Sequence, residues 1–532
     1  MSAASRLPRR ALLPLIAVLA LLYAAPARAV QFTFGTTTVG TSNNPLDANA
    51  KAVNLLTSPK AGTIVNIQGY LDGLGAGSGS QKIKAVVYTL VNGTPTGLLG
   101  ASNEVTINAG QHAGWVTFTF PGAVSIPSGP VGIGYIRGGP TTRLARAFMD
   151  TAVGTRKANS DTYSDGPANP FGTVTTTVNS LFAIKVTADD GFPPLADRVG
   201  VNTPNVITEG WNLLYSQTIL ADDGIHLFRD SPGPLNIWPS SGGTPDWSNT
   251  DKLVAFVKNI SGGQLLPVMT FSNPWQHPSC TATPSWQCAP DPAYYQEWSD
   301  EVVAVMDHLV AQGIAVPEIE YWNEPWCCSF WLPQSNPSAY VALLRVLSTT
   351  VWARYPAAKI LVSADYWQQG STCSASPCPE WFSLVLQADT TNLINDPRIV
   401  LTTHNYAGSS SPATDRGTGW SFDRYKLAHD QAVAHGKSSP HVEITEYGWE
   451  ADTGCVVFND GVPEATQSQY TVDGARQAFA TGYVDKVFIF DEYRGANTGC
   501  TGTQFAYNMH RADGTARPMA GAVKTYIAAG IP

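Results

Sequence analysis

The sequence predicts a closed (β/α)8 barrel of parallel strands that follows an all-β sandwich. From residue 198 on, short apolar runs alternate with longer segments whose apolar residues recur at three- and four-residue spacing. This alternation is typical of strands that are each followed by a helix. Before residue 187 the chain is rich in Thr, Gly, Val and Ser and holds only short alternating runs, which favours antiparallel strands.

Eight runs in the C-terminal part have the length and composition of strands. They span residues 198–202, 225–230, 264–271, 317–325, 359–365, 398–406, 441–449 and 486–493. Helical segments between them include residues 251–260, 297–313, 339–355, 422–436 and 518–530. Eight such units suit a closed barrel better than an open doubly wound sheet. Neither a G-x-G-x-x-G nor a G-x-x-x-x-G-K-[ST] motif follows any of the runs, which disfavours a nucleotide-binding sheet.

The N-terminal part predicts a sandwich through runs such as KIKAVVYTL, GWVTFTF, VGIGYI and LFAIKVTA, which Gly- and Pro-bearing turns separate. The segment DDGFPPLAD joins an acidic pair to Gly and two prolines, a composition typical of a linker. We therefore expect a β-sandwich over residues 30–187, a linker over 188–197 and the barrel over 198–532.

The first 29 residues have the features of an export signal. Arginines open the segment, the apolar run ALLPLIAVLALLYAA follows, and Ala27-Arg28-Ala29 fits a small-residue cleavage site. A membrane anchor is the alternative, but the run is shorter than a bilayer span and contains Pro14. We expect a secreted protein, extracellular or periplasmic in a Gram-negative source, with no membrane attachment after cleavage.

Charge restricts the partners of the chain. Its 32 Lys and Arg against 41 Asp and Glu give a formal net charge of -9, and we find no basic run that would follow a phosphate backbone. We therefore expect no nucleic acid partner, and we expect a monomer.

The eight cysteines are even in number in a chain that we expect to be exported, so disulfides are the first interpretation. Proximity along the chain suggests the pairs Cys280–Cys288, Cys373–Cys378 and Cys455–Cys500, while Cys327 and Cys328 would brace a loop. A zinc site lacks clear His partners, and a catalytic cysteine lacks a nearby His. We expect no cofactor and no metal.

Polar residues gather where the expected barrel strands end, which is where such barrels carry their working groups. They are Arg229, Asn273, Asn323, Glu324, Asp365, His404, Tyr406, Glu446, Asp491 and Glu492. Glu324 in YWNEP and Glu446 in ITEYGW end the fourth and seventh strands. Because these strands face each other across the barrel mouth, the two carboxyl groups would meet at one bond, as glycosidic cleavage requires.

These motifs resemble those of the retaining clan A glycoside hydrolases with a TIM barrel, families 5 and 39 among them, over about residues 198–530. The motif LFRD on the second strand and HNY on the sixth support the resemblance. It implies that Glu324 is the acid/base and Glu446 the nucleophile of a double displacement. The residues that it implies for substrate binding or for positioning the pair are Asn323, Arg229, His404 and Tyr406.

The tryptophans expected in loops after strands include Trp275, Trp326, Trp367 and Trp449, where their flat rings would stack on sugars. The N-terminal part resembles the jelly-roll-like accessory sandwich domains of secreted carbohydrate-active enzymes, which implies glycan binding. Asn159, Asp161 and Asp165 would form either a calcium site or, as we prefer, an acidic turn.

One carboxylate competes with Glu446 for the role of nucleophile. Glu443 shares a strand with Glu446, but strand alternation places residues 442, 444 and 446 on one face and Glu443 on the other. Glu320 would be a buried carboxylate paired with Arg229 or another base.

The predicted function is that of a secreted retaining glycoside hydrolase acting on β-linked carbohydrate. The alternative is a non-catalytic carbohydrate-binding or cell-surface protein on the same scaffold. A serine hydrolase lacks its G-x-S-x-G motif.

Overall fold

The computed structural model describes residues 31–203, 218, 220, 222–326, 330–365, 380–414, 421–451, 461–492, 507–511 and 514–530, without the side chains of 151–153. The described residues up to Pro193 form one compact unit, and those from Pro194 on form a second. Outside the described residues lie the expected signal segment, Trp367, Cys327, Cys328, Cys373, Cys378, Cys455 and Cys500.

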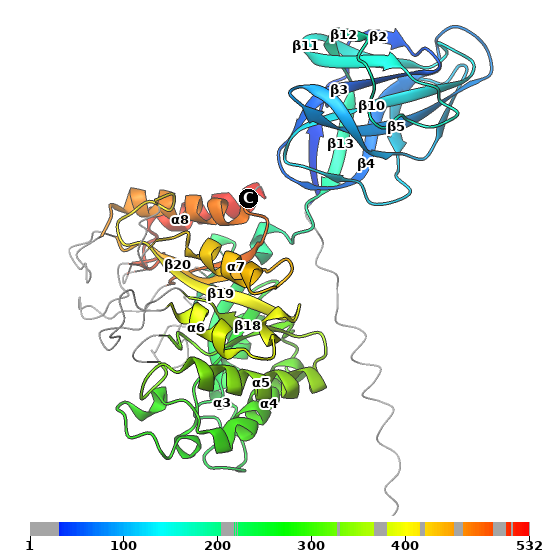
Figure 1. Ribbon diagram of the computed structural model, residues 1–532. Helices are drawn as coiled ribbons and strands as arrows, with labels where there is room; N and C mark the ends of the chain where they lie inside the picture. The colour runs from blue at the N-terminus through cyan, green and yellow to red at the C-terminus, as the bar shows by residue number, and fades with distance from the viewer. Residues whose placement is uncertain are drawn as a thin grey trace, which may run out of the picture. The chain divides into compact units, whose positions relative to one another are not determined.

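The second unit contains a closed barrel of eight strands, which confirms the predicted barrel (Figure 1). The strands are β14 (Val199–Asn202), β15 (Leu227–Gly233), β16 (Gln264–Met269), β17 (Glu318–Tyr321), β18 (Lys359–Ser363), β19 (Ile399–Tyr406), β20 (Val442–Gly448) and β21 (Val484–Ile489). Each overlaps one of the eight expected runs. Neighbours pair in parallel all the way round, and β14 closes the barrel by pairing with both β15 and β21.

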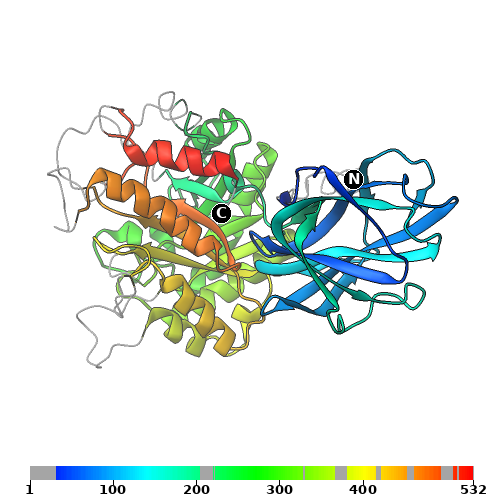
Figure 2. The same ribbon diagram turned by 90° about the horizontal axis from the view of Figure 1, so that it is seen from above.

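Helices surround the strands of the barrel (Figures 1 and 2). They are α3 (Ser248–Lys258), α4 (Tyr295–Ala311), α5 (Pro337–Arg354), α6 (Trp381–Ala388), α7 (Arg424–Ala434), α8 (Glu464–Phe479) and α9 (Pro518–Ala529). Local signals set some of their ends. Asn336 caps α5 by accepting from the Ala339 amide, with Pro337 in the first turn, and α9 ends at Gly530, whose φ of 64° suits glycine.

The barrel strands are buried on both faces, which explains their near-continuous apolar runs. One face forms a small core of strand residues inside the barrel, made of Leu227, Leu266, Leu361, Val400 and Phe488. The other face packs against the helices in a much larger core that includes Ile319, Tyr321 and Ile444. None of the described helices is long and apolar enough to cross a membrane.

The first unit is an antiparallel β-structure. Its strands are β1 (Gln31–Gly35), β2 (Ser42–Pro45), β3 (Ala50–Ser58), β4 (Gly62–Asp72), β5 (Ser80–Val91), β6 (Thr94–Ala101), β7 (Val105–Asn108), β8 (Gly114–Phe118), β9 (Ser125–Ile126), β10 (Gly129–Pro140), β11 (Arg146–Ser160), β12 (Thr176–Phe182) and β13 (Ile184–Asp189). The main path is β1-β13-β4-β11-β3-β10-β5-β6. Ala52 and Val53, neighbours on β3, belong to two different apolar clusters, so both faces of that strand are covered.

The acidic segment that ends β11 is engaged by protein groups. Asp161 lies 2.8 Å from the buried Lys51 ammonium and accepts from the Ala168 amide at 3.0 Å. The Asn159 side chain donates to the Phe171 carbonyl at 2.7 Å. These contacts agree with the acidic turn that we preferred over a calcium site.

Candidate active site

Arg229 on β15 is the centre of a buried hydrogen-bond network. It donates twice to Glu320 on β17, at 2.5 and 2.9 Å, and once to Glu446 on β20, at 2.7 Å. It also donates to the side-chain oxygens of Asn202 at 2.7 Å and Asn323 at 2.9 Å. Burial alone would raise the pKa of Glu320, but the charge of Arg229 outweighs it and holds that pKa at about 2. Of the two alternatives that the sequence left for Glu320, Arg229 or another base, the structure shows Arg229.

A β-bulge on β20 turns Glu446 into the barrel mouth. Thr403 and His404 are neighbours on β19, and they pair with Ile444 and Glu446 on β20. Thr445 is therefore an extra residue in the ladder. Ile444 packs toward the helices, whereas Thr445 donates to the buried Glu320 at 3.1 Å and Glu446 reaches Arg229. The prediction that Ile444 and Glu446 share a face is therefore wrong, because the bulge puts two successive side chains on the inner face.

Glu443 also faces the barrel interior, but it lies before the bulge, toward the start of the strand. Its carboxylate is 3.3 Å from the Lys486 ammonium on β21, and Lys486 binds Glu318 at the start of β17 as well. Burial raises the pKa of Glu443 well above its usual range. Of the two glutamates on β20, Glu446 is therefore the one that meets Glu324.

Glu324 lies on a tight turn directly after β17. Trp322 and Glu324 have φ angles of 67° and 43°, in the left-handed region that costs a non-glycine residue about 1–3 kcal/mol. Packing holds the turn in this conformation, since Trp322 is buried and its indole donates to the Phe330 carbonyl at 2.6 Å. The Trp322 amide also donates to the Met269 carbonyl on β16 at 3.2 Å.

His404 and Tyr406 on β19 connect the two glutamates. The Nδ1 atom of His404 lies 2.8 Å from Glu324 and 3.5 Å from Glu446, and the Tyr406 hydroxyl donates to Glu446 at 2.7 Å. Burial by itself would lower the pKa of His404, but the carboxylates around it, Glu446 first, outweigh burial and raise that pKa well above its usual range. Burial and Glu446 raise the pKa of Tyr406, so its hydroxyl remains a donor.

One carboxylate oxygen of Glu324, one of Glu446 and a ring nitrogen of His404 all lie within 4.8 Å of one another. Two acidic groups thus converge from opposite sides of the barrel mouth. One of them, Glu446, accepts hydrogen bonds from Arg229 and Tyr406, while the other, Glu324, lies 2.8 Å from the ring of His404. The pair is suited to attack a carbon and to move a proton at the same bond.

Asp365, which follows β18, joins the two sides of this site. Its carboxylate accepts from the Trp326 indole at 2.8 Å and from the His404 amide at 2.9 Å. Burial raises the pKa of Asp365 to about 7. Its position at a strand end was visible in the sequence, but nothing there showed that it would tie the loop of Glu324 to the strand of His404.

The expected tryptophan platforms differ in exposure. Trp275 is half-buried and its indole donates to Glu297 at 2.9 Å, and Trp326 is half-buried beside Asp365. Trp449 is only 1% exposed and packs against Phe422 with its indole on the Ser410 carbonyl. Its ring therefore has no open face on which a sugar would stack.

Side chains suited to metals form two groups in the part of the chain that the structure describes. They are Glu324, His404 and Glu446, and a buried group of Asp223, Glu492 and His510. In the second group His510 bonds to Glu492 at 2.8 Å and lies 3.6 Å from Asp223. Burial lowers the pKa of His510, but its two carboxylate neighbours outweigh it and raise that pKa. The imidazole of His510 thus lies between two acidic side chains.

No family model and no curated protein matches the chain. Solved structures that are similar include a family 39 glycoside hydrolase from Bacteroides cellulosilyticus WH2 (14% identity, 92% of this chain and 82% of that chain, TM-score 0.44). A monomeric β-xylosidase from Caulobacter crescentus CB15 has 17% identity over 62% of this chain and 67% of its own, with a TM-score of 0.43. The CBM22-1 and GH10 modules of a Clostridium thermocellum endo-1,4-β-D-xylanase have 10% identity over 93% of each chain, with a TM-score of 0.41. All three are glycoside hydrolases, the class that the motifs of this sequence resemble.

Proposed function

We propose that the protein is a secreted retaining glycoside hydrolase that cleaves β-linked polysaccharide or oligosaccharide chains. The approach of Glu324 and Glu446, with oxygens within 4.8 Å, is the observation that carries the proposal. Retaining enzymes place their two carboxyl groups about 5–5.5 Å apart, whereas inverting enzymes need about 6.5–9.5 Å to admit a water molecule. The pair in this barrel suits the shorter spacing.

In the first step Glu446 attacks the anomeric carbon while Glu324 gives its proton to the leaving oxygen. The bond between that carbon and the leaving oxygen breaks, and an ester bond to Glu446 forms. Arg229 and Tyr406 donate to Glu446 at 2.7 Å each and aim its carboxyl group at that carbon.

In the second step Glu324, now ionised, takes a proton from water. The hydroxide oxygen attacks the same carbon, the ester bond to Glu446 breaks, and the sugar leaves with its original configuration. Asn323 supports both steps. Because its side-chain oxygen accepts from Arg229, its NH2 group is left to donate to the hydroxyl beside the reacting carbon, a contact that strengthens in the transition state.

The remaining parts of the proposal concern the environment of the enzyme. The Cys280–Cys288 disulfide, which agrees with one of the pairs expected from the sequence, supports an oxidising compartment. We assign the N-terminal unit as a sandwich-type accessory domain that binds glycan. Retention of the full chain on insoluble glycans, compared with a chain that begins at Pro194, tests that assignment, and equal retention of the two proteins would contradict it.

Kinetics of two variants test the mechanism. Glu446→Gln abolishes turnover, and Glu324→Ala lowers kcat on substrates with poor leaving groups by on the order of 10²- to 10⁴-fold, spares activated aryl glycosides and recovers with azide. Glu443→Gln, a matched change of a buried glutamate on the same strand, keeps activity. NMR of the first product shows retained configuration. Wild-type rates in both site variants, or an inverted product, would refute the mechanism.

A further inference from the structure

Trp286 exposes a large apolar ring in the segment between β16 and α4. It is 41% exposed, and among the described residues only one other tryptophan, Trp115 in the first unit at 37%, appears with the exposed large apolar side chains. A single exposed apolar side chain is ordinary on a protein surface. Trp286 differs from such a residue because its segment is restrained and because it lies near the turn of Glu324.

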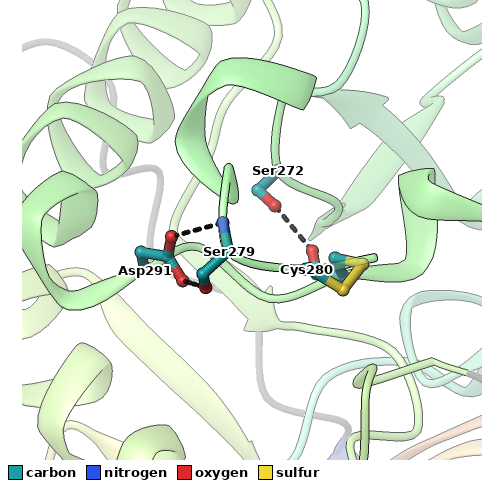
Figure 3. The surroundings of a disulfide bond; sticks show 5 residues. Ser272, Ser279, Cys280 and Asp291 are labelled. Carbon is teal, nitrogen blue, oxygen red and sulfur yellow. Dashed lines mark hydrogen bonds between the residues drawn. A yellow bond between two sulfur atoms is a disulfide. The ribbon is translucent and has the colours of Figure 1, made fainter. Parts of the chain in front are cut away.

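The segment that carries this ring is fastened at both ends (Figure 3). The disulfide joins Cys280 to Cys288, and the Ser272 hydroxyl, just after β16, donates to the Cys288 carbonyl at 2.6 Å. The Ser279 amide and hydroxyl both donate to Asp291, at 3.1 and 2.5 Å. These bonds restrict the segment before any ligand arrives, so binding there loses less conformational entropy.

Ring contacts connect Trp286 to the turn of Glu324. Its ring meets Phe271, the second residue after β16, with centroids 5.0 Å apart and planes at 67°. Phe271 in turn meets Trp322 at 5.4 Å and 86°, and stacks along Phe330 at 6.0 Å and 16°. Trp322 lies two residues before Glu324. Trp286 therefore lies at the carboxyl end of the barrel strands, on the side of the acid/base, and two ring contacts away from its turn.

We propose that Trp286 is a platform on which a sugar of the glycan stacks at a distance from the cleaved bond. A flat ring that keeps part of its surface in water gains free energy when the apolar C–H face of a pyranose covers it. The inference rests on the proposed function and narrows its substrate. A substrate that contacts both Glu324 and Trp286 would be a chain of sugars, so the inference favours a polysaccharide or a longer oligosaccharide over a glycoside of a single sugar.

Chain-length kinetics test the inference. The probes are β-linked gluco-, xylo-, manno- and galacto-oligosaccharides of two to six sugars, with the aryl monoglycoside of each. In Trp286→Ala the ratio of kcat/KM for the best hexasaccharide to kcat/KM for its aryl monoglycoside falls about tenfold, mainly through KM, and Trp286→Phe restores most of it. Trp115→Ala, the matched exposed tryptophan, keeps the wild-type ratio on these soluble probes.

The outcomes separate this inference from the proposed function. An unchanged ratio in Trp286→Ala, or an equal loss on both kinds of substrate, overturns the platform and leaves the hydrolase assignment intact. If the wild type hydrolyses no probe, the hydrolase assignment fails, and calorimetric titration of hexasaccharides into the wild type and Trp286→Ala decides the platform. Binding that is weaker in Trp286→Ala supports it, and the same affinity in both proteins, or no binding to either, overturns it.

Discussion

Replacement of Arg229 by methionine removes the cation from the buried network and leaves Glu320 and Glu446 without their shared partner. The Arg229 side chain is 6% exposed and those of the two glutamates 2% and 10%, so water replaces little of what is lost. Methionine keeps the length of the stem and adds no new polar group. The variant therefore isolates the charge and the five hydrogen bonds that Arg229 gives to Glu320, Glu446, Asn202 and Asn323.

Two estimates of the cost agree. Breaking a buried ion pair by removing one partner costs about 3–5 kcal/mol. The pKa of Glu320 falls from 4.5 to about 2 in the folded protein, and that difference corresponds to about 3 kcal/mol of stability. Because the folded pKa is depressed, this stability is present above the unfolded pKa and is lost as pH falls through about 2. We expect Arg229→Met to lower the free energy of unfolding by about 3–5 kcal/mol at pH 7, and by less near pH 3.

Urea unfolding followed by tryptophan fluorescence measures this cost in the barrel, since every tryptophan except Trp115 lies beyond the first unit. Arg354→Met is the matched control, because Arg354 pairs with Asp307 at 2.9 Å on the surface, with side chains 53% and 40% exposed, and such pairs contribute about 1 kcal/mol or less. In Arg229→Met/Glu320→Gln the cost is smaller than the sum of the single variants. A loss in Arg229→Met no larger than in Arg354→Met would refute the reasoning.

Two further predictions concern the groups around the site. Asp365→Asn gains stability over the wild type by up to about 4 kcal/mol as pH rises from 4 to 8. The folded pKa of Asp365 is raised to about 7, so between its unfolded pKa and about 7 ionisation of this group stabilises the unfolded wild type and has no counterpart in the variant. The same difference in the free energy of unfolding between the two proteins at pH 4 and at pH 8 would contradict this. Cys280→Ser/Cys288→Ser removes a cross-link of sequence separation 8, which the chain-entropy model values at about 2–3 kcal/mol. We expect faster amide hydrogen exchange of residues 281–287 in this variant and unchanged exchange of β17. Equal protection of residues 281–287 in the variant and the wild type would show that other contacts alone hold the segment.

Local patterns in the sequence were sufficient for the barrel and for the identity of its two central glutamates. Strands buried on both faces are continuous apolar runs, and helices that cover them have a 3.6-residue period, so all eight strands were predicted within a few residues of their bounds. Strand order then placed Glu324 and Glu446 across the barrel mouth. The same reasoning expected Glu320 to pair with Arg229 or another base, because a buried carboxylate requires a partner.

Only the tertiary structure decided how the side chains are presented. The bulge at Thr445 depends on pairing with β19, some forty residues earlier in the chain, so strand alternation alone aimed Glu446 wrongly. The left-handed backbone of Trp322 and Glu324 persists because neighbouring elements hold it, against local preference. The exposure of each tryptophan is likewise a property of what packs on it: Trp449 lies in the core and Trp286 at the surface. Residue type and periodicity specify the elements, whereas side-chain direction and exposure arise from contacts between residues that are far apart in the chain.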